Sequence, residues 1–363
     1  EYPMQQGGGN DGRPYSFGRP SSGGSKAAYP CKSYGQGRIN PAYFYGVFDP
    51  NDMRRDVSIT MTGSNGKGAE KLIPFVPNSK AEGGGLTLNK WDENRQANPW
   101  VAAQRKSGIN GPYMRMSEVY LGYAEVCAAL GDVVTGKQYL KTVRERSFPQ
   151  GLANTDAFIA AFGNDLVRAI IEERGFEYAG EGDRRWTLIR SGYLPEDIKR
   201  IKDMTKAMMD GLATKGYYEF ENGNIISAYI WTKLVDAKTI YGHRLTAQCP
   251  TDKVNDPVLY PGWRGQKDNW EEMGLNYGSS TPATNLAIKG LFEIVSEEEA
   301  ASLESQGYTK VNWGIDLVDN RDEYDKYLFW DYDYVSAPIY LWPFTPNVMA
   351  AGGFTNGYGF KQE

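Results

Sequence analysis

The clearest pattern of apolar and polar positions runs from about residue 113 to residue 193. Apolar side chains recur there every three or four residues, which is typical of α-helices. The residues that share one face of the first predicted helix are Met116, Val119, Tyr120, Tyr123, Cys127 and Leu130. Gly131-Asp132 ends this helix, and a second carries an apolar face over residues 139–143. Together they predict a hairpin of the tetratricopeptide type.

Two further helices are predicted in the same segment. Asn154 caps one of them, and the next covers residues 165–178 with Leu166, Ile170 and Ile171 facing inward. We therefore expect residues 113–193 to form a helical core.

The flanking segments show weaker patterns. Residues 1–112 are rich in Gly, Pro, Asn and Ser, which predicts long loops, with one strand where Val57, Ile59 and Met61 alternate with polar residues. Residues 194–363 are mixed. They contain a helix over 197–212, a hairpin at Asn222-Gly223, a helix opened by a capping box at 296–299, and an extended end. The whole chain reads as one mainly α domain.

Composition excludes several function classes. The 363 residues carry a net charge of −5, whereas nucleic-acid binding needs a basic face. The single histidine, His243, argues against histidine-based metal sites and a Ser-His-Asp triad. Three cysteines are too few for a disulfide framework. We expect Cys127 to be buried, and pairing of Cys31 with Cys249 stays open.

A run of charged residues covers much of the fourth predicted helix and the segment that follows it. It has two interpretations. The carboxylates are either an acid and base pair, as in glycosidases, or members of an ion-pair network. An adjacent arginine lowers the pKa of a carboxyl group, which is unsuitable for a general acid, so the pattern favours the network. The residues assigned to this structural network are Arg115, Glu118, Glu173, Arg174, Glu177, Glu181, Arg184 and Arg185.

Aromatic residues make up 13% of the chain, and many lie in predicted loops beside Gly, Pro, Asn or Arg. An aromatic face can cover the C–H face of a sugar ring while polar neighbours bind its hydroxyls. The alternative is that the rings anchor loops to the body. The candidate glycan-binding residues are Tyr15, Tyr29, Tyr34, Trp91, Trp263 and Trp270.

Other candidate sites are weaker. Asp331 and Asp333 would share a strand face and could bind Ca²⁺, but a solvated face is favoured. The glycine clusters at 7–9 and 83–85 lack the strand-before, helix-after context of a phosphate loop. We therefore expect no catalytic residue, no metal and no cofactor.

Four motifs in order resemble one family. They are FDPNDMRRDVSIT, YMRMSEVYLGYAEVCAALGD, EERGFEYAGEGDRRWTLIRSG, and YLWPFTPNVM with TNGYGF. They resemble segments of SusD/RagB-type outer-membrane nutrient-binding lipoproteins, over the C-terminal two-thirds of such a protein. Residues 194–290 match nothing recognisable in that family.

The resemblance implies a helical fold with tetratricopeptide-like pairs, long loops and a few short β-hairpins. It implies non-catalytic capture of oligosaccharides at the cell surface of a Bacteroidetes-type bacterium, with a lipid anchor in an N-terminal part outside this chain. The implied partner is a SusC-like TonB-dependent transporter barrel in the outer membrane. Peptide capture is the alternative within the family, and an all-helical glycoside hydrolase is the rival outside it.

Overall fold

The computed structural model describes residues 38–64, 70–72, 75, 85–91, 112–236, 284–322, 340, 344–353 and 355. These residues form mainly α-helices, with small antiparallel sheets of two or three strands. The predicted mainly α fold with a few short β-hairpins is therefore confirmed.

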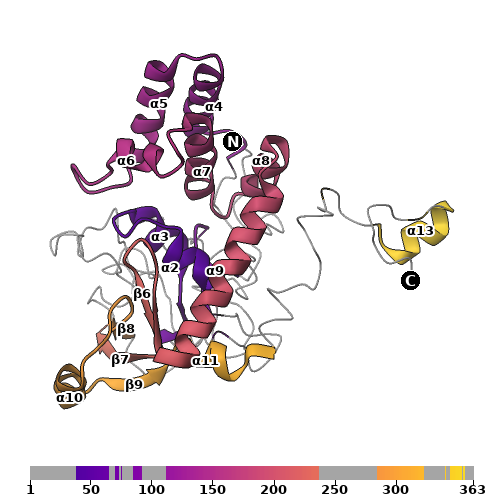
Figure 1. The fold of residues 1–363 in the computed structure, drawn as a ribbon. Helices are drawn as coiled ribbons and strands as arrows, with labels where there is room; N and C mark the ends of the chain where they lie inside the picture. Colours follow the sequence, from indigo (N-terminus) through magenta and orange to yellow (C-terminus); the bar gives the residue numbers. More distant parts are fainter. Residues whose placement is uncertain are drawn as a thin grey trace, which may run out of the picture.

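Four helices pack together in the upper part of Figure 1. They are α4 (Met116–Ala129), α5 (Val133–Glu145), α6 (Thr155–Ala160) and α7 (Leu166–Glu177). The side chain of Asp132 caps α5 by accepting a hydrogen bond from the Thr135 amide. At Gly136 of α5, a Cβ atom would lie 3.0 Å from the carbonyl oxygen of Ala124 on α4. The glycine therefore permits the close approach of the predicted helical hairpin.

The face of α4 that enters the core differs from what its apolar spacing suggests. Ser117, Leu121, Ala124 and Cys127 are buried against α5 and α7, as was predicted for Cys127 alone. The exposed face is also apolar, and its large residues are Met116, Val119, Tyr123, Val126 and Leu130. We call this set the outer face of α4. A helix that is apolar on opposite sides suits packing on both sides.

Most of the rest of the fold lies below this helical part, while α8 (Asp183–Ser191) lies beside α7 (Figure 1). Its other helices are α2 (Pro41–Gly46), α3 (Met53–Ser58), α9 (Leu194–Lys215), α10 (Glu297–Ser305) and α11 (Gly314–Asp319). The long helix α9 extends from the helical part down to α11 (Figure 1). The predicted helix over 197–212 lies within α9, which is longer at both ends.

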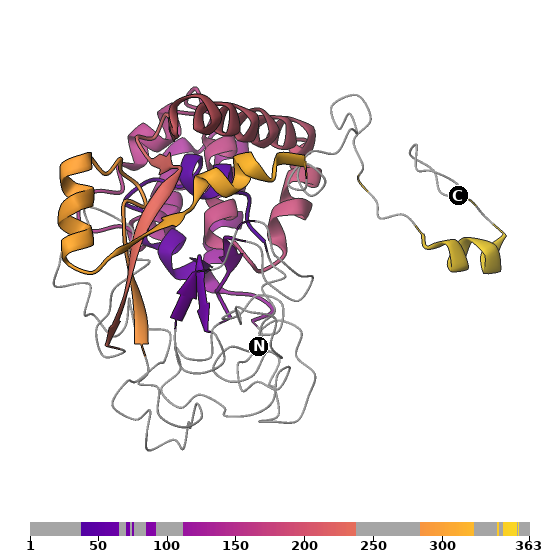
Figure 2. The same cartoon turned by 90° about the horizontal axis from the view of Figure 1, so that it is seen from below.

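All strand pairs among the described residues are antiparallel. The two-stranded sheets join β1 (Ile59–Thr60) to β4 (Thr87–Leu88), β2 (Thr62–Ser64) to β3 (Glu70–Leu72), and β5 (Tyr217–Glu219) to β6 (Ile225–Ser227). A three-stranded sheet has the order β8 (Thr284–Lys289), β7 (Tyr229–Asp236), β9 (Thr309–Asn312). Figure 2 shows the indigo strands of the first segment beside this sheet, where β3 contacts β8.

The main core joins the first segment to α9 and the sheets. Tyr45 of α2 is fully buried, and its hydroxyl donates to the Leu291 carbonyl at 3.1 Å and accepts from the Trp313 indole N–H at 2.8 Å. The Asn222-Gly223 turn joins β5 to β6 as predicted. The Asn222 amide donates to the carbonyls of Tyr45 and Phe48, both at 2.8 Å. These contacts hold the hairpin against the end of α2.

Two predicted elements differ from the structure. Val57 lies in α3, so the strand begins only at Ile59. The extended C-terminal end contains helix α13 (Pro346–Gly352), in which proline occupies the first turn, where its missing N–H is no loss. The capping box of Ser296 and Glu299 is present at the start of α10, as predicted.

Candidate functional site

Helix α7 carries charged residues into the interior of the protein. Arg168, Glu172, Glu173, Arg174 and Glu177 are all at most 7% exposed. The side chain of Asp165 caps the helix by accepting from the Arg168 amide. Buried charges are costly unless they are paired and hydrogen-bonded. The partners of these five side chains therefore determine what this region can do.

Glu173 and Glu177 join α7 to three other segments. Glu173 binds Arg54 at 2.6 Å and Arg144 at 3.0 Å. Glu177 binds Arg54 at 3.2 Å, Arg115 at 2.8 Å and Arg146 at 2.5 Å. The two carboxylates thus connect α7 to α3, to α5 and its C-terminal end, and to the residue that precedes α4.

The remaining charges of α7 connect it to α8 and α9. Arg184 of α8 binds Glu172 and Asp197, both at 3.0 Å. Gly175 makes room for this contact, because a Cβ there would lie 2.9 Å from a terminal nitrogen of Arg184. Arg168 binds Glu172 at 2.9 Å, one helical turn away.

Arg174 and Arg115 extend the network to α4. Arg174 binds Glu118 at 2.7 Å and Asp183 at 2.6 Å. Arg115 makes two hydrogen bonds to Glu181, at 2.8 and 2.9 Å, and Lys90 also reaches Glu181 at 2.5 Å. Arg185 contacts the Tyr340 carbonyl at 3.4 Å. The structure thus joins seven of the eight residues assigned to the network, and Arg185 lies near them in the wall of the pocket described below.

The pKa values of the carboxyl groups follow from these contacts. Burial acts to raise the pKa of Glu177, but the hydrogen bond from Arg146 and the neighbouring Arg54 and Arg115 outweigh it and lower the pKa to about 2. Burial also acts to raise the pKa of Asp197, but Arg184 and Arg200 outweigh it and lower this pKa. A general acid at neutral pH needs a raised pKa. Neither carboxyl group suits that role.

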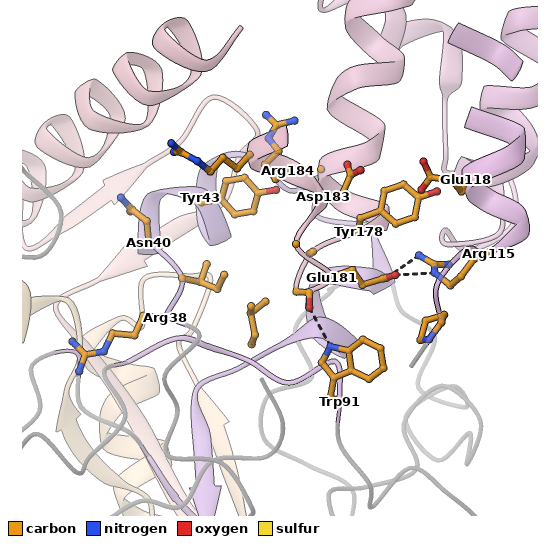
Figure 3. A pocket seen from close by; sticks show the side chains of 18 of the residues that line it. Arg38, Asn40, Tyr43, Trp91, Arg115, Glu118, Tyr178, Glu181, Asp183 and Arg184 are labelled. Atoms are coloured by element: carbon orange, nitrogen blue, oxygen red, sulfur yellow. Dashed lines mark hydrogen bonds and ion pairs between the residues drawn. The ribbon is translucent and has the colours of Figure 1, made fainter. Parts of the chain in front are cut away.

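A pocket of about 780 Å³ opens beside this network (Figure 3). Its walls come from the start of α2, from Leu88 and Trp91, from residues 112–118, from residues 175–185, and from Ile201 of α9. Gly180 and Gly182 have φ values of +79° and +88°, which glycine adopts without strain, and they turn the chain from α7 into α8. The turn carries Glu181 and Asp183 to the pocket wall.

Trp91 is one of the aromatic residues that line this pocket. Its indole N–H donates to the Gly180 carbonyl at 3.1 Å, and the side chain is 9% exposed (Figure 3). This contact anchors residue 91 to the turn, as the loop-anchoring alternative expects, while part of the residue still lines the pocket. Tyr43 and Tyr178 also line it, and burial raises the pKa of both hydroxyls to about 12. Both hydroxyls therefore stay protonated at neutral pH.

The other aromatic candidates cannot be placed. Tyr15, Tyr29, Tyr34, Trp263 and Trp270 lie outside the described residues. The same holds for His243, Cys31 and Cys249, for Asp331 and Asp333, and for the two glycine clusters apart from Gly85. Cys127 is a buried free thiol.

Sequence reasoning did not identify several residues of this region. Arg54, Arg144 and Arg146 hold the α7 carboxylates, and Asn40 and Tyr43 line the pocket. Arg54 lies in the motif FDPNDMRRDVSIT, so a signal existed for it. The contacts of Arg144 and Arg146 arise from the packing of α5 against α7, and no local pattern indicates them.

Two kinds of feature are absent from the described part of the chain. None of its helices is long and apolar enough to cross a membrane. In the same ranges, no group of three or more His, Cys, Asp or Glu side chains is arranged to hold a metal ion.

Comparison with known proteins places this arrangement in a family. The sequence profile of the SusD family matches residues 1–343, beginning ahead of the first motif. One relative, SusD-like protein P25 from Formosa agariphila, is 28% identical over 160 residues, which are 44% of this chain. The match spans about a quarter (26%) of that relative's length, and no solved structure matches. Since the family profile covers nearly the whole sequence, the chain belongs to the SusD family.

Proposed function

We propose that this protein captures oligosaccharides at the bacterial cell surface, without cleaving them, and passes them to a SusC-like TonB-dependent transporter. The observation that carries the proposal is the pocket beside α7 in a member of the SusD family. Its walls combine aromatic rings with polar side chains, and sugar rings need both kinds of contact. The protein would act at the outer membrane, held by a lipid anchor.

Pocket residues of two kinds support ligand capture. Tyr113 at the rim is 76% exposed, and Met114 beside it is 61% exposed. Asn40 and Tyr43 bring an amide and a hydroxyl to the wall that lies across from Trp91 and Arg115 (Figure 3). A glycan ring placed between these walls would meet an apolar surface on one side and hydrogen-bonding groups on the other.

Calorimetric titration with a panel of oligosaccharides tests the proposal. We expect Trp91→Ala and Tyr113→Ala to weaken binding by about tenfold, which corresponds to the roughly 1.4 kcal/mol expected when one aromatic contact is lost. Trp186→Ala is the matched control, because Trp186 is 57% exposed on α8 and does not line the pocket. Unchanged affinity in both pocket variants would mean that the oligosaccharide does not bind in this pocket.

The same titration separates the alternatives. Binding of a peptide library without any glycan response would favour peptide capture, which relies on backbone hydrogen bonds. New reducing ends in the glycan samples, lost on acid-to-amide substitution, would favour a glycoside hydrolase. The carboxylates that line the pocket are held by arginine, which supports binding over hydrolysis.

The outer face of α4 supports the proposed partner. Its five large apolar residues are each at least 49% exposed, and exposed apolar patches of this kind mark interaction sites. We propose that the transporter covers this face. Val119→Lys with Val126→Lys would then abolish co-purification with the transporter from outer membranes and leave oligosaccharide affinity unchanged. Co-purification that survives both substitutions would place the interface elsewhere.

A further inference from the structure

The charged side chains that line the pocket are already engaged with the protein. Seven described residues of this kind contribute to the walls, and each has a partner. They are Arg38, Arg115, Glu118, Glu181, Asp183, Arg184 and Arg185. A pocket surrounded by so many charges therefore has few of them available for a ligand.

The three carboxylates are held by cations that themselves lie in or behind the wall. Glu181 receives two hydrogen bonds from Arg115 and an ion pair from Lys90. Glu118 and Asp183 share Arg174, which is 5% exposed. A cationic ligand group would have to compete with these contacts for each carboxylate.

Two guanidinium groups of the wall, Arg115 and Arg184, already donate several hydrogen bonds to the protein. Arg115 donates to the Glu177 carboxylate and carbonyl as well as to Glu181. Arg184 donates to the Ile171 carbonyl and to Glu172 and Asp197, while its Nε is buried. An anionic ligand group would have to displace buried carboxylates from these arginines.

Groups that suit an uncharged ligand remain. The Tyr43 hydroxyl stays protonated because burial raises its pKa. Asn40 also lines the pocket; its amide donates to the Thr205 hydroxyl and accepts from the Ala42 amide, both at 2.8 Å, which leaves one N–H and one oxygen lone pair unused within the described residues. Leu88, Ile201 and the rim residue Met114 add apolar surface. Hydroxyl-bearing rings can use both kinds of group without breaking an ion pair.

From this geometry we propose that the pocket selects uncharged oligosaccharides over sulfated or uronic-acid ones. The inference rests on the proposed function of glycan capture and names the chemical class of the glycan. The ion pairs that engage the three carboxylates, Arg115 and Arg184, rather than a single residue, are the source of the selectivity.

The test compares short neutral glucan and galactan oligosaccharides with sulfated forms of the same chains, by calorimetry at low and high NaCl. We expect the neutral form to bind at least about tenfold more tightly, with an affinity that changes less than about twofold with salt, because screening acts on charged contacts. Tighter binding of the sulfated form would overturn the inference while leaving glycan capture intact. No response to either series would overturn the proposed function and this inference together.

A gain-of-function variant tests the charge balance itself. Glu181→Gln removes the carboxylate shared by Arg115 and Lys90, so their charge becomes available to an anion. We expect the ratio of the affinity for the neutral form to that for the sulfated form to fall by about threefold or more. Glu145→Gln is the control, because Glu145 forms an exposed ion pair with Lys141 outside the pocket. An unchanged preference in Glu181→Gln, with wild-type thermal stability, would contradict the proposed origin of selectivity.

Discussion

Substitution of Glu177 by glutamine tests whether the α7 network stabilises the fold. The variant keeps the side-chain shape but removes the charge that faces Arg54, Arg115 and Arg146. The Glu177 side chain is 2% exposed, so its ion pairs are shielded from water, although Arg146 is 55% exposed. The loss should therefore exceed that of a surface pair.

The magnitude follows from the pKa of Glu177. Each pKa unit corresponds to about 1.4 kcal/mol, so lowering the pKa from 4.5 to about 2 contributes roughly 3 kcal/mol to stability at pH 7. Breaking a buried ion pair costs about 3–5 kcal/mol, and exposure of Arg146 places this case at the lower end. We expect Glu177→Gln to lower the free energy of unfolding by about 3 kcal/mol.

The pH dependence gives the sign of the effect. Because folding lowers the pKa of Glu177, its contribution is complete above the unfolded pKa and is lost as pH falls from about 5 towards 2. Urea denaturation at a series of pH values measures it, and the difference between wild type and variant should shrink over this range.

The control is Glu145→Gln, whose pair with Lys141 is half exposed on both sides. We expect it to cost about 0.5 kcal/mol or less. Equal stability of Glu177→Gln and wild type at pH 7, or a difference that does not change with pH, would refute the reasoning.

Three other substitutions have defined outcomes. Gly175→Ala should lower the free energy of unfolding by about 1–3 kcal/mol, because its Cβ would meet Arg184, and denaturant titration measures this. Gly122 on α4 has no neighbour within 4 Å of an added Cβ, so Gly122→Ala should raise stability by about 0.5–1 kcal/mol; a loss there would contradict the open space around this position. Asn222→Ala should cost about 2 kcal/mol in the same assay, since two carbonyls near the end of α2 lose their donor. A neutral result would mean that water replaces the amide.

Local patterns predicted helix positions well where a single signal dominates. The caps at Asn154 and Ser296 and the turn at Asn222-Gly223 all appear in the structure. These signals work because each satisfies backbone groups within a few residues.

Tertiary contacts account for what local patterns missed. Both faces of α4 are apolar, so periodicity alone could not tell which face enters the core. Arg168 and Glu172 lie one helical turn apart, so their ion pair is a local contact, but the partners of Glu177 come from α3, from before α4 and from beyond α5. Likewise, the pocket forms only when segments distant in sequence meet.

The most direct test of glycan capture is a crystal structure of the protein with a neutral oligosaccharide selected by calorimetry. The account predicts an intact sugar chain in the pocket beside α7, with a ring against Trp91 or Tyr113 and hydroxyls near Asn40 and Tyr43. A sugar bound elsewhere with this pocket closed, or a ligand cleaved during the experiment, would contradict it.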